Sequence, residues 1–146
     1  MNTKLTVFVD SDAFVATVKK VDPTHKKSLY LLDILMQQSA ILVTSNYVFS
    51  ETITVLSQRM GQAAAIAYID QIQSSNKFFL KEWVDESLEE AAIEVFKKQT
   101  SKNTSFVDCT NMAFMQKMHI DAIFSFDQVY KKNGFTLLED FLKQRK

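Results

Sequence analysis

The chain has 146 residues with 17 basic and 17 acidic side chains, so it carries no formal net charge. This length, with 47% hydrophobic and 23% charged residues, is typical of one globular domain with a real core. Because the charges balance, a polyanion would have to be held by a local patch of cations and not by the overall charge. We therefore expect a single domain over residues 1–146.

The single cysteine, Cys109, cannot form an internal disulfide, which fits a reducing compartment. Residues 1–10 lack the basic and then apolar run of a signal peptide. The apolar stretches elsewhere are broken by charge well before the ~18 residues that suggest a membrane span. These features favour a cytoplasmic protein that does not associate with membranes.

The N-terminal part of the chain predicts a buried strand followed by a short helix. Residues 7–9 are β-branched or aromatic, which suits a strand buried on both faces. The strand ends at Asp10, and Asp12 is placed to cap the helix that the next apolar residues predict. Open α/β sheets build their ligand crevices at the carboxyl ends of parallel strands, so Asp10 is the first candidate site residue.

Helices and strands alternate through the rest of the chain. Asp22 and Pro23 predict the start of a helix that runs to about residue 38. A strand at 41–43 precedes a helix that stops at Gly61. Further helices are expected at 62–74, at 85–98 and after Ser105, further strands at 77–84, 122–126 and 135–138, and a basic tail at 140–146. This alternation predicts an α/β fold, a three-layer α/β/α sandwich with a mainly parallel sheet.

Four acidic residues recur in one kind of place. Asp10 and Asp127 each follow a buried strand, whereas Glu51 and Asp108 each lie near the start of a helix beside apolar neighbours. Carboxylates gathered in a crevice are the ligands that Mg²⁺ or Mn²⁺ requires, and such an ion can activate water at a phosphoryl group.

Each acid also has a simpler interpretation. Asp10 and Asp127 could only cap the turns that follow them, and Asp108 could complete a capping box with Ser105. Glu51 could be a solvated acid at the border of its helix.

Four segments in this order carry a resemblance to a known family. They read VFVDSDAFVA, SNYVFSETITVL, SFVDCTNMAFM and AIFSFDQVYKKNGFTLL, and the match runs from residue 7 to residue 138. The set resembles the acidic motifs of PIN-domain ribonucleases, and above all those of the VapC-like toxins of type II toxin–antitoxin pairs. The resemblance implies a PIN-like nuclease domain over 1–146 whose metal-binding and catalytic acids are Asp10, Glu51, Asp108 and Asp127.

The same resemblance implies an activity and partners. The protein would be an endoribonuclease that uses Mg²⁺ or Mn²⁺, a toxin that binds an antitoxin protein, and a homodimer. Ser11 and Ser105 would orient the acids, and Asp12, where the family more often has a neutral residue, adds a carboxylate near the site. The Ala-rich, apolar helix at 62–74 also favours a dimer.

Two other functions stay open on the sequence alone. A strand followed by Asp10-x-Asp12 also resembles the start of haloacid-dehalogenase-type phosphatases, but Ala13 departs from that pattern and Asp127 has no adjacent acid. The third possibility is a non-catalytic PIN-like module that binds another protein, against which the presence of all four acids argues. Lysines also cluster after the first and fourth motifs, where they could steer phosphates or simply be solvated: Lys19, Lys20, Lys26, Lys27, Lys131 and Lys132.

Overall fold

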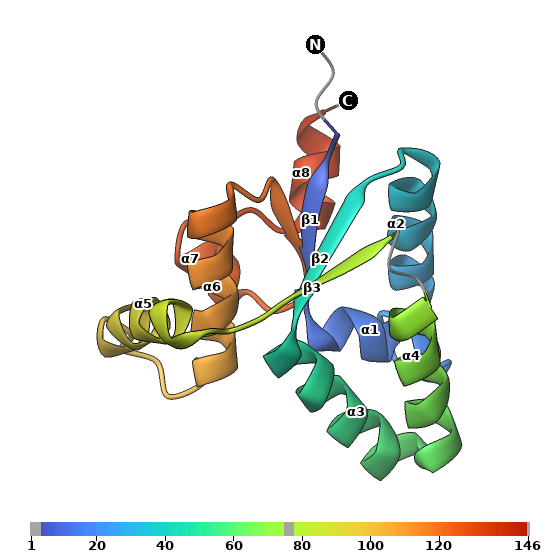
Figure 1. Ribbon diagram of the computed structural model, residues 1–146. Helices are drawn as coiled ribbons and strands as arrows, with labels where there is room; N and C mark the ends of the chain where they lie inside the picture. The colour runs from blue at the N-terminus through green and yellow to red at the C-terminus, as the bar shows by residue number, and fades with distance from the viewer. Residues whose placement is uncertain (1–3, 75–77, 146) are drawn as a thin grey trace.

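The computed structural model describes residues 4–74 and 78–145, and within them a four-stranded parallel sheet lies between layers of helices (Figure 1). The strands are β1 (Thr6–Val9), β2 (Ile41–Ser45), β3 (Phe79–Glu82) and β4 (Ala122–Phe124). They lie in the order β3-β2-β1-β4, and each neighbouring pair is parallel. The predicted three-layer α/β/α sandwich with a parallel sheet is confirmed.

The helices are α1 (Ser11–Val18), α2 (His25–Gln37), α3 (Asn46–Met60), α4 (Gln62–Ser74), α5 (Glu86–Lys97), α6 (Phe106–Met118), α7 (Val129–Lys132) and α8 (Leu138–Gln144). Figure 1 shows α1 to α4 to the right of the sheet and α5 to α7 to its left. Helix α1 packs against α2 and α3, and α5 packs against α6. Within 4–74 and 78–145, no helix is both long and apolar enough to cross a bilayer.

Strand β1 lies inside the sheet, and its side chains form the centre of the core. Val7 and Phe8 are completely buried, and the ring of Phe8 stacks on Phe114 of α6 with the ring centroids 5.7 Å apart. Because β1 pairs with both β2 and β4, the carboxyl ends of these strands meet at one edge of the sheet. The backbone N–H of Asp10 donates to the carbonyl of Phe124 at 3.1 Å, so the residues after β1 and β4 lie side by side.

Two predicted helix starts are wrong. The N-cap of α1 is Asp10, whose side chain accepts from the N–H of Ser11, so Asp12 lies in the first turn and does not cap it. Helix α2 begins at His25, because the carboxylate of Asp22 accepts from both the N–H and the hydroxyl of Thr24. That local turn keeps Asp22 and the proline after it outside the helix.

The other expected boundaries mostly agree with the structure. Helix α3 ends at Gly61, as predicted, and this glycine has a φ of 96° that side-chain-bearing residues rarely adopt. Strand β3 is an edge strand that covers only part of the predicted 77–84, and residue 77 lies outside the described residues. Strand β4 ends at Phe124, two residues before the predicted end.

The expected last strand and basic tail are wrong. Residues 135–138 contribute one isolated bridge, between Leu137 and Ile123, and the chain then forms α8. Helix α8 forms because Leu138, Phe141 and Leu142 pack against the core, which a solvated tail would not do. The C-terminal residues thus cover the sheet at the end where β1 begins (Figure 1).

Candidate active site

Asp10 is buried at the end of β1, with 5% of its surface exposed, and three groups donate to its carboxylate. Its Oδ1 accepts from the N–H of Ser11 at 2.7 Å and from Nδ2 of Asn111 at 3.1 Å. Its Oδ2 accepts from the hydroxyl of Tyr130 at 2.6 Å. Burial, and then repulsion by Asp12, raises the pKa of Asp10 to about 8.

Asp108, in the first turn of α6, uses its two carboxylate oxygens differently. Oδ2 accepts from the N–H of Ser105 at 3.0 Å, and the Ser105 hydroxyl accepts from the N–H of Asp108 at 3.0 Å. This is the predicted capping box. The other oxygen, Oδ1, lies 3.1 Å from the Tyr130 hydroxyl that also binds Asp10. The capping box therefore holds Asp108 so that Oδ1 points at the Tyr130 hydroxyl, which also donates to Asp10.

The hydroxyl of Tyr130 lies between two carboxylates but has only one proton to donate. Nδ2 of Asn111 donates to the same hydroxyl at 3.0 Å. This bond gives the hydroxyl no second proton to donate to the acids. A second donor or a cation is needed to satisfy both acids. With its raised pKa, Asp10 carries a proton at neutral pH when no metal ion is bound.

Asp12 and Asp127 lie beside the end of β4. Oδ2 of Asp12 accepts from the N–H of Phe126 at 2.8 Å and from the Ser125 hydroxyl at 3.1 Å, which ties α1 to the residues after β4. Asp127 is exposed, and its Oδ1 accepts from a backbone N–H two residues on, which closes the turn before α7. Burial raises the pKa of Asp12 to about 6 and also raises the pKa of Asp108, and the charge of Asp127 adds to both shifts.

Glu51 of α3 is connected to the other acids through Ser11. The hydroxyl of Ser11 donates to Oε1 of Glu51, while the N–H of the same serine donates to Asp10. Glu51 is half-buried, so it is not the freely solvated acid that its position at the border of an apolar stripe allowed. Ser11 thus holds one acid from β1 and one from α3.

These groups fit a hard divalent cation by their chemistry. Asp10 and Asp108 converge on one hydroxyl, and Oδ1 of Asp12 is buried without a hydrogen-bond partner in the part of the chain described. All the candidate ligands are carboxylate oxygens, which Mg²⁺ and Mn²⁺ prefer. Within residues 4–74 and 78–145, however, no three acidic, His or Cys side chains already surround one point as metal ligands would.

Sequence analysis missed two members of the cluster, Asn111 and Tyr130, which are both completely buried. Asn111 lies three residues after Asp108, so the two side chains share one face of α6, and this spacing was the available signal. Tyr130 gave no signal beyond marking one helical turn. Its role depends on the packing of α7 against α6, which no local pattern specifies.

Comparison with known proteins places this chain in a family. Residues 7–135 match the PIN domain, so the chain belongs to the PIN-domain family. It is 33% identical over 129 residues to the 23S rRNA-specific endonuclease VapC20 of Mycobacterium tuberculosis, a match that covers 88% of this chain and 95% of that relative.

A solved structure agrees with that sequence match. The crystal structure of Mycobacterium tuberculosis VapC20, described as a sarcin–ricin loop cleaving toxin, superposes with a TM-score of 0.79 at 31% identity. The match covers 89% of this chain and 96% of that one. The predicted resemblance to VapC-like ribonuclease toxins is confirmed, and the haloacid-dehalogenase alternative is not supported.

The shared hydroxyl predicts that Asp108→Asn stabilises the metal-free protein. The variant loses one charge, keeps an oxygen for the N–H of Ser105, and places an amide beside Tyr130, whose single proton is then free for Asp10. In EDTA at neutral pH the melting temperature should rise by about 3 °C, as expected for roughly 1 kcal/mol at this chain length. The further rise caused by Mn²⁺, measured by differential scanning calorimetry, should shrink.

The matched control is Glu90→Gln, which removes one charge from an exposed position on α5 and should change neither temperature. A lower metal-free melting temperature together with an unchanged Mn²⁺ response would mean that Asp108 is only a helix cap.

The raised carboxyl pKa values predict a pH dependence of the metal-free stability. Asp10 shifts from 3.8 to about 8, and Asp12 from 3.8 to about 6, so between these limits the folded state binds more protons than the unfolded state. The resulting stabilisation is complete below about pH 4 and is lost as the pH rises through 8. Urea unfolding in EDTA should therefore give a free energy that falls from pH 5 to pH 8, and Asp10→Asn should flatten this slope. An equal slope in the variant would contradict the assignment of the shift to Asp10.

Proposed function

We propose that this protein is a divalent-metal-dependent endoribonuclease in which Asp10, Glu51, Asp108 and Asp127 hold Mg²⁺ or Mn²⁺. The observation that carries the proposal is the convergence of Asp10 and Asp108 on the hydroxyl of Tyr130 at the carboxyl ends of the strands. When bound, such an ion supplies an activated water and neutralises charge on the phosphodiester under attack.

The chain's own residues would hold these acids ready. Asn111 and Tyr130 fix both oxygens of Asp10, so the carboxylate cannot rotate away from the crevice. The capping box fixes Asp108 through its other oxygen, and Ser11 fixes Glu51. Side chains locked in this way lose little freedom when a ligand arrives, which is what precise placement of an RNA phosphodiester requires.

The relatives suggest a substrate and a biological role. Because the Mycobacterium tuberculosis relative is named as a 23S rRNA-specific endonuclease and its structure as a sarcin–ricin loop cleaving toxin, we propose the same loop of ribosomal RNA as the substrate here. The same likeness supports a toxin that acts in the cytoplasm and is neutralised by an antitoxin protein. An antitoxin reading frame directly beside this one is the simplest supporting observation.

The activity test uses an RNA stem-loop with the sarcin–ricin sequence. The protein should cleave it with Mg²⁺ or Mn²⁺, and EDTA should abolish cleavage. Asp10→Asn should lower the rate by more than the ~10–100-fold that loss of a ligand's supporting partner costs, while the far-ultraviolet circular dichroism stays unchanged. Asp33→Asn makes the same chemical change at an exposed position on α2 and should cleave normally.

Each other result has a defined meaning. If Asp10→Asn cleaves as fast as the unmodified protein, the assignment of the site is wrong. If the protein cleaves a phosphomonoester and leaves RNA intact, it is a phosphatase. If it cleaves neither, the fold serves as a protein-binding module.

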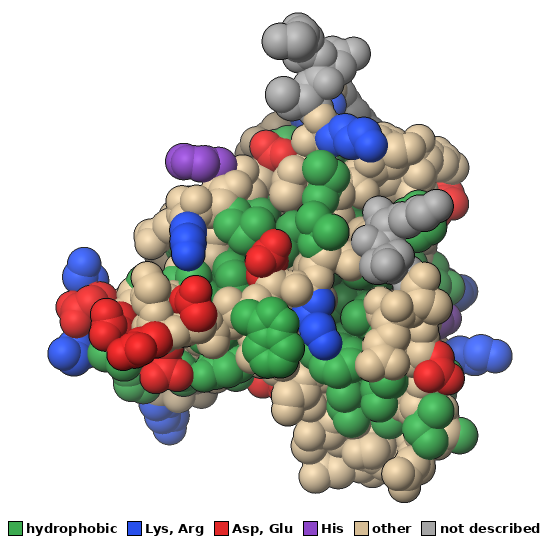
Figure 2. Space-filling view, viewed as in Figure 1, with side chains coloured by type: hydrophobic (Ala, Val, Ile, Leu, Met, Phe, Trp, Pro, Cys, Tyr) green, Lys and Arg blue, Asp and Glu red, His purple; other side chains and the backbone are tan. Residues whose placement is uncertain are grey.

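We also propose a homodimer with α4 in its interface. Helix α4 packs inward through Ala65, Tyr68 and Ile72, and its outer side exposes Ala63, Ile66 and Ala67. Ile66 is 50% exposed, which is costly for an isoleucine that nothing covers. Figure 2 shows hydrophobic side chains over the α3 and α4 region at the lower right, whereas acidic side chains gather over α5 at the left. The side with fewer acidic side chains is the better surface for a second copy.

The dimer proposal predicts the effect of one charge on α4. In sedimentation experiments at micromolar concentration, Ile66→Glu should convert the dimer to a monomer, because it would bury two like charges in the interface. Gln116→Glu adds the same charge at an exposed position on α6 and should leave the dimer intact. A monomeric unmodified protein would disprove the proposal.

A further inference from the structure

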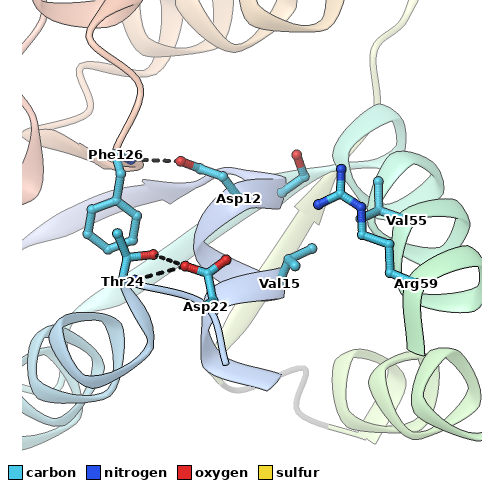
Figure 3. A pocket seen from close by; sticks show the side chains of 8 residues that line it. Asp12, Val15, Asp22, Thr24, Val55, Arg59 and Phe126 are labelled. Carbon is cyan, nitrogen blue, oxygen red and sulfur yellow. Dashed lines mark hydrogen bonds between the residues drawn. The ribbon is translucent and has the colours of Figure 1, made fainter. Parts of the chain in front are cut away.

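A cavity of about 240 Å³ opens directly beside the acidic cluster (Figure 3). Its walls come from separate parts of the chain: Ser11 and Asp12 of α1, Asp22 before α2, Val55 and Arg59 of α3, and Phe126 after β4. Ser11 and Asp12 also belong to the acidic cluster, so the cavity adjoins the candidate metal ligands.

Arg59 is the cation of this cavity. Figure 3 shows its side chain on one wall, across the cavity from Asp22 and Phe126. The ion pairs among residues 4–74 and 78–145 do not include Arg59, although two carboxylates line the same cavity. Asp12 is bound to the N–H of Phe126, and Asp22 is bound to Thr24. Arg59 therefore faces the cavity as a cation with no anion of its own in the described part of the chain.

A second hollow shares Arg59 with the first. It measures about 370 Å³ and is lined by Val18, Lys19, Lys20, Val21, Arg59 and Met60. This hollow contains three cations and no acid, and Arg59 lines both hollows. The chain has no net charge, so three cations around one hollow are a local feature and not a consequence of overall composition.

The two hollows follow helix α1 from end to end. Ser11 and Asp12 begin this eight-residue helix and Lys19 follows it, so about 12 Å separates the acids from the lysines. A short stretch of single-stranded RNA spans that distance. Phe126 on one wall and Val55 on the opposite wall give the first hollow apolar surfaces on which a base can rest, and the cations of the second match phosphates.

We propose that the RNA strand next to the cleaved phosphodiester runs along α1, with one nucleotide in the first hollow. Arg59 binds the phosphate of that nucleotide. Lys19 and Lys20 bind the phosphate of the next nucleotide. This proposal rests on the proposed ribonuclease function, because it names the path by which the substrate reaches that site. Arg59 also lies in the last turn of α3, where a cation interacts favourably with the helix dipole. The interaction with the helix dipole needs only a positive charge. It does not involve RNA, so it does not affect how RNA binding depends on salt.

Binding is measured in the Asp10→Asn background, so that the RNA stays intact. The probe is the sarcin–ricin stem-loop, compared with a single-stranded oligoribonucleotide of mixed sequence, over a series of salt concentrations. Arg59→Gln should weaken binding about tenfold and reduce the slope of log K against log salt by about 0.7, the value for one phosphate contact on a single strand. Lys19→Gln with Lys20→Gln should reduce the slope further, and Arg59→Lys should restore most of the lost affinity.

The chain supplies a matched control, because its other arginine is Arg145. This residue ends α8, near the termini and away from the acids, and its guanidinium lies over the ring of Phe141. Arg145→Gln makes the same change in net charge and should leave both affinity and salt slope unchanged. In cleavage assays, Arg59→Gln should raise KM more than it lowers kcat, whereas Arg145→Gln should change neither.

The possible failures are distinguishable. If the protein cleaves RNA and Arg59→Gln changes only the melting temperature, the RNA path is wrong while the proposed function stands. If the protein cleaves no RNA but binds it with a slope that depends on Arg59 and not on Arg145, the path stands and the proposed reaction is wrong. If the Asp10→Asn protein binds no RNA even at low salt, or if both arginine variants lose the same affinity, the path is disproved.

Discussion

The site depends on one hydroxyl, that of Tyr130, which lies within hydrogen-bonding distance of both Asp10 and Asp108. Asp10 directly follows β1 and Asp108 lies in α6, almost a hundred residues further along the chain, and the tyrosine comes from α7. Like charges in a buried place repel each other, so they stay together only if a donor or a cation compensates them. Tyr130 has one phenolic proton, whereas both Asp10 and Asp108 need a donor at this position. A bound proton or cation can compensate the acid to which the hydroxyl does not donate. The fold supplies the remaining restraint, because α6 is buried against β1 and cannot move away.

The acids cap helices or turns and also face the acidic cluster. Their interpretation as helix caps therefore does not exclude a second role. Asp10 caps α1 and also binds Tyr130, and Asp108 caps α6 with one oxygen while the other faces the cluster. Asp127 closes the turn before α7 and adds its charge to those of its neighbours. The capping bonds fix the orientation of each carboxylate, so a structural role is the means by which each acid is placed. A cap and a metal ligand were alternatives in the sequence, but the structure makes them compatible.

Much of this architecture could be predicted because local patterns determine it. The buried run in β1, the capping box of Ser105 and Asp108, and the glycine after α3 each depend on residues close together in sequence. What could not be predicted depends on distant partners. Asp12 was expected to cap α1, but it binds the backbone after β4, more than a hundred residues away. Helix α8 was taken for a tail because its packing against the core is a tertiary contact that charge-rich sequence conceals. Asn111 and Tyr130 were missed for the same reason.

The positions of Asp10 and Tyr130 in the chain have a consequence for synthesis. Asp10 is translated 120 residues before Tyr130 of α7, whose hydroxyl donates to it. A nascent chain therefore carries a complete β1 and α1 long before the cluster can assemble. For a ribonuclease, this order separates the synthesis of the first acid from the assembly of the site in time.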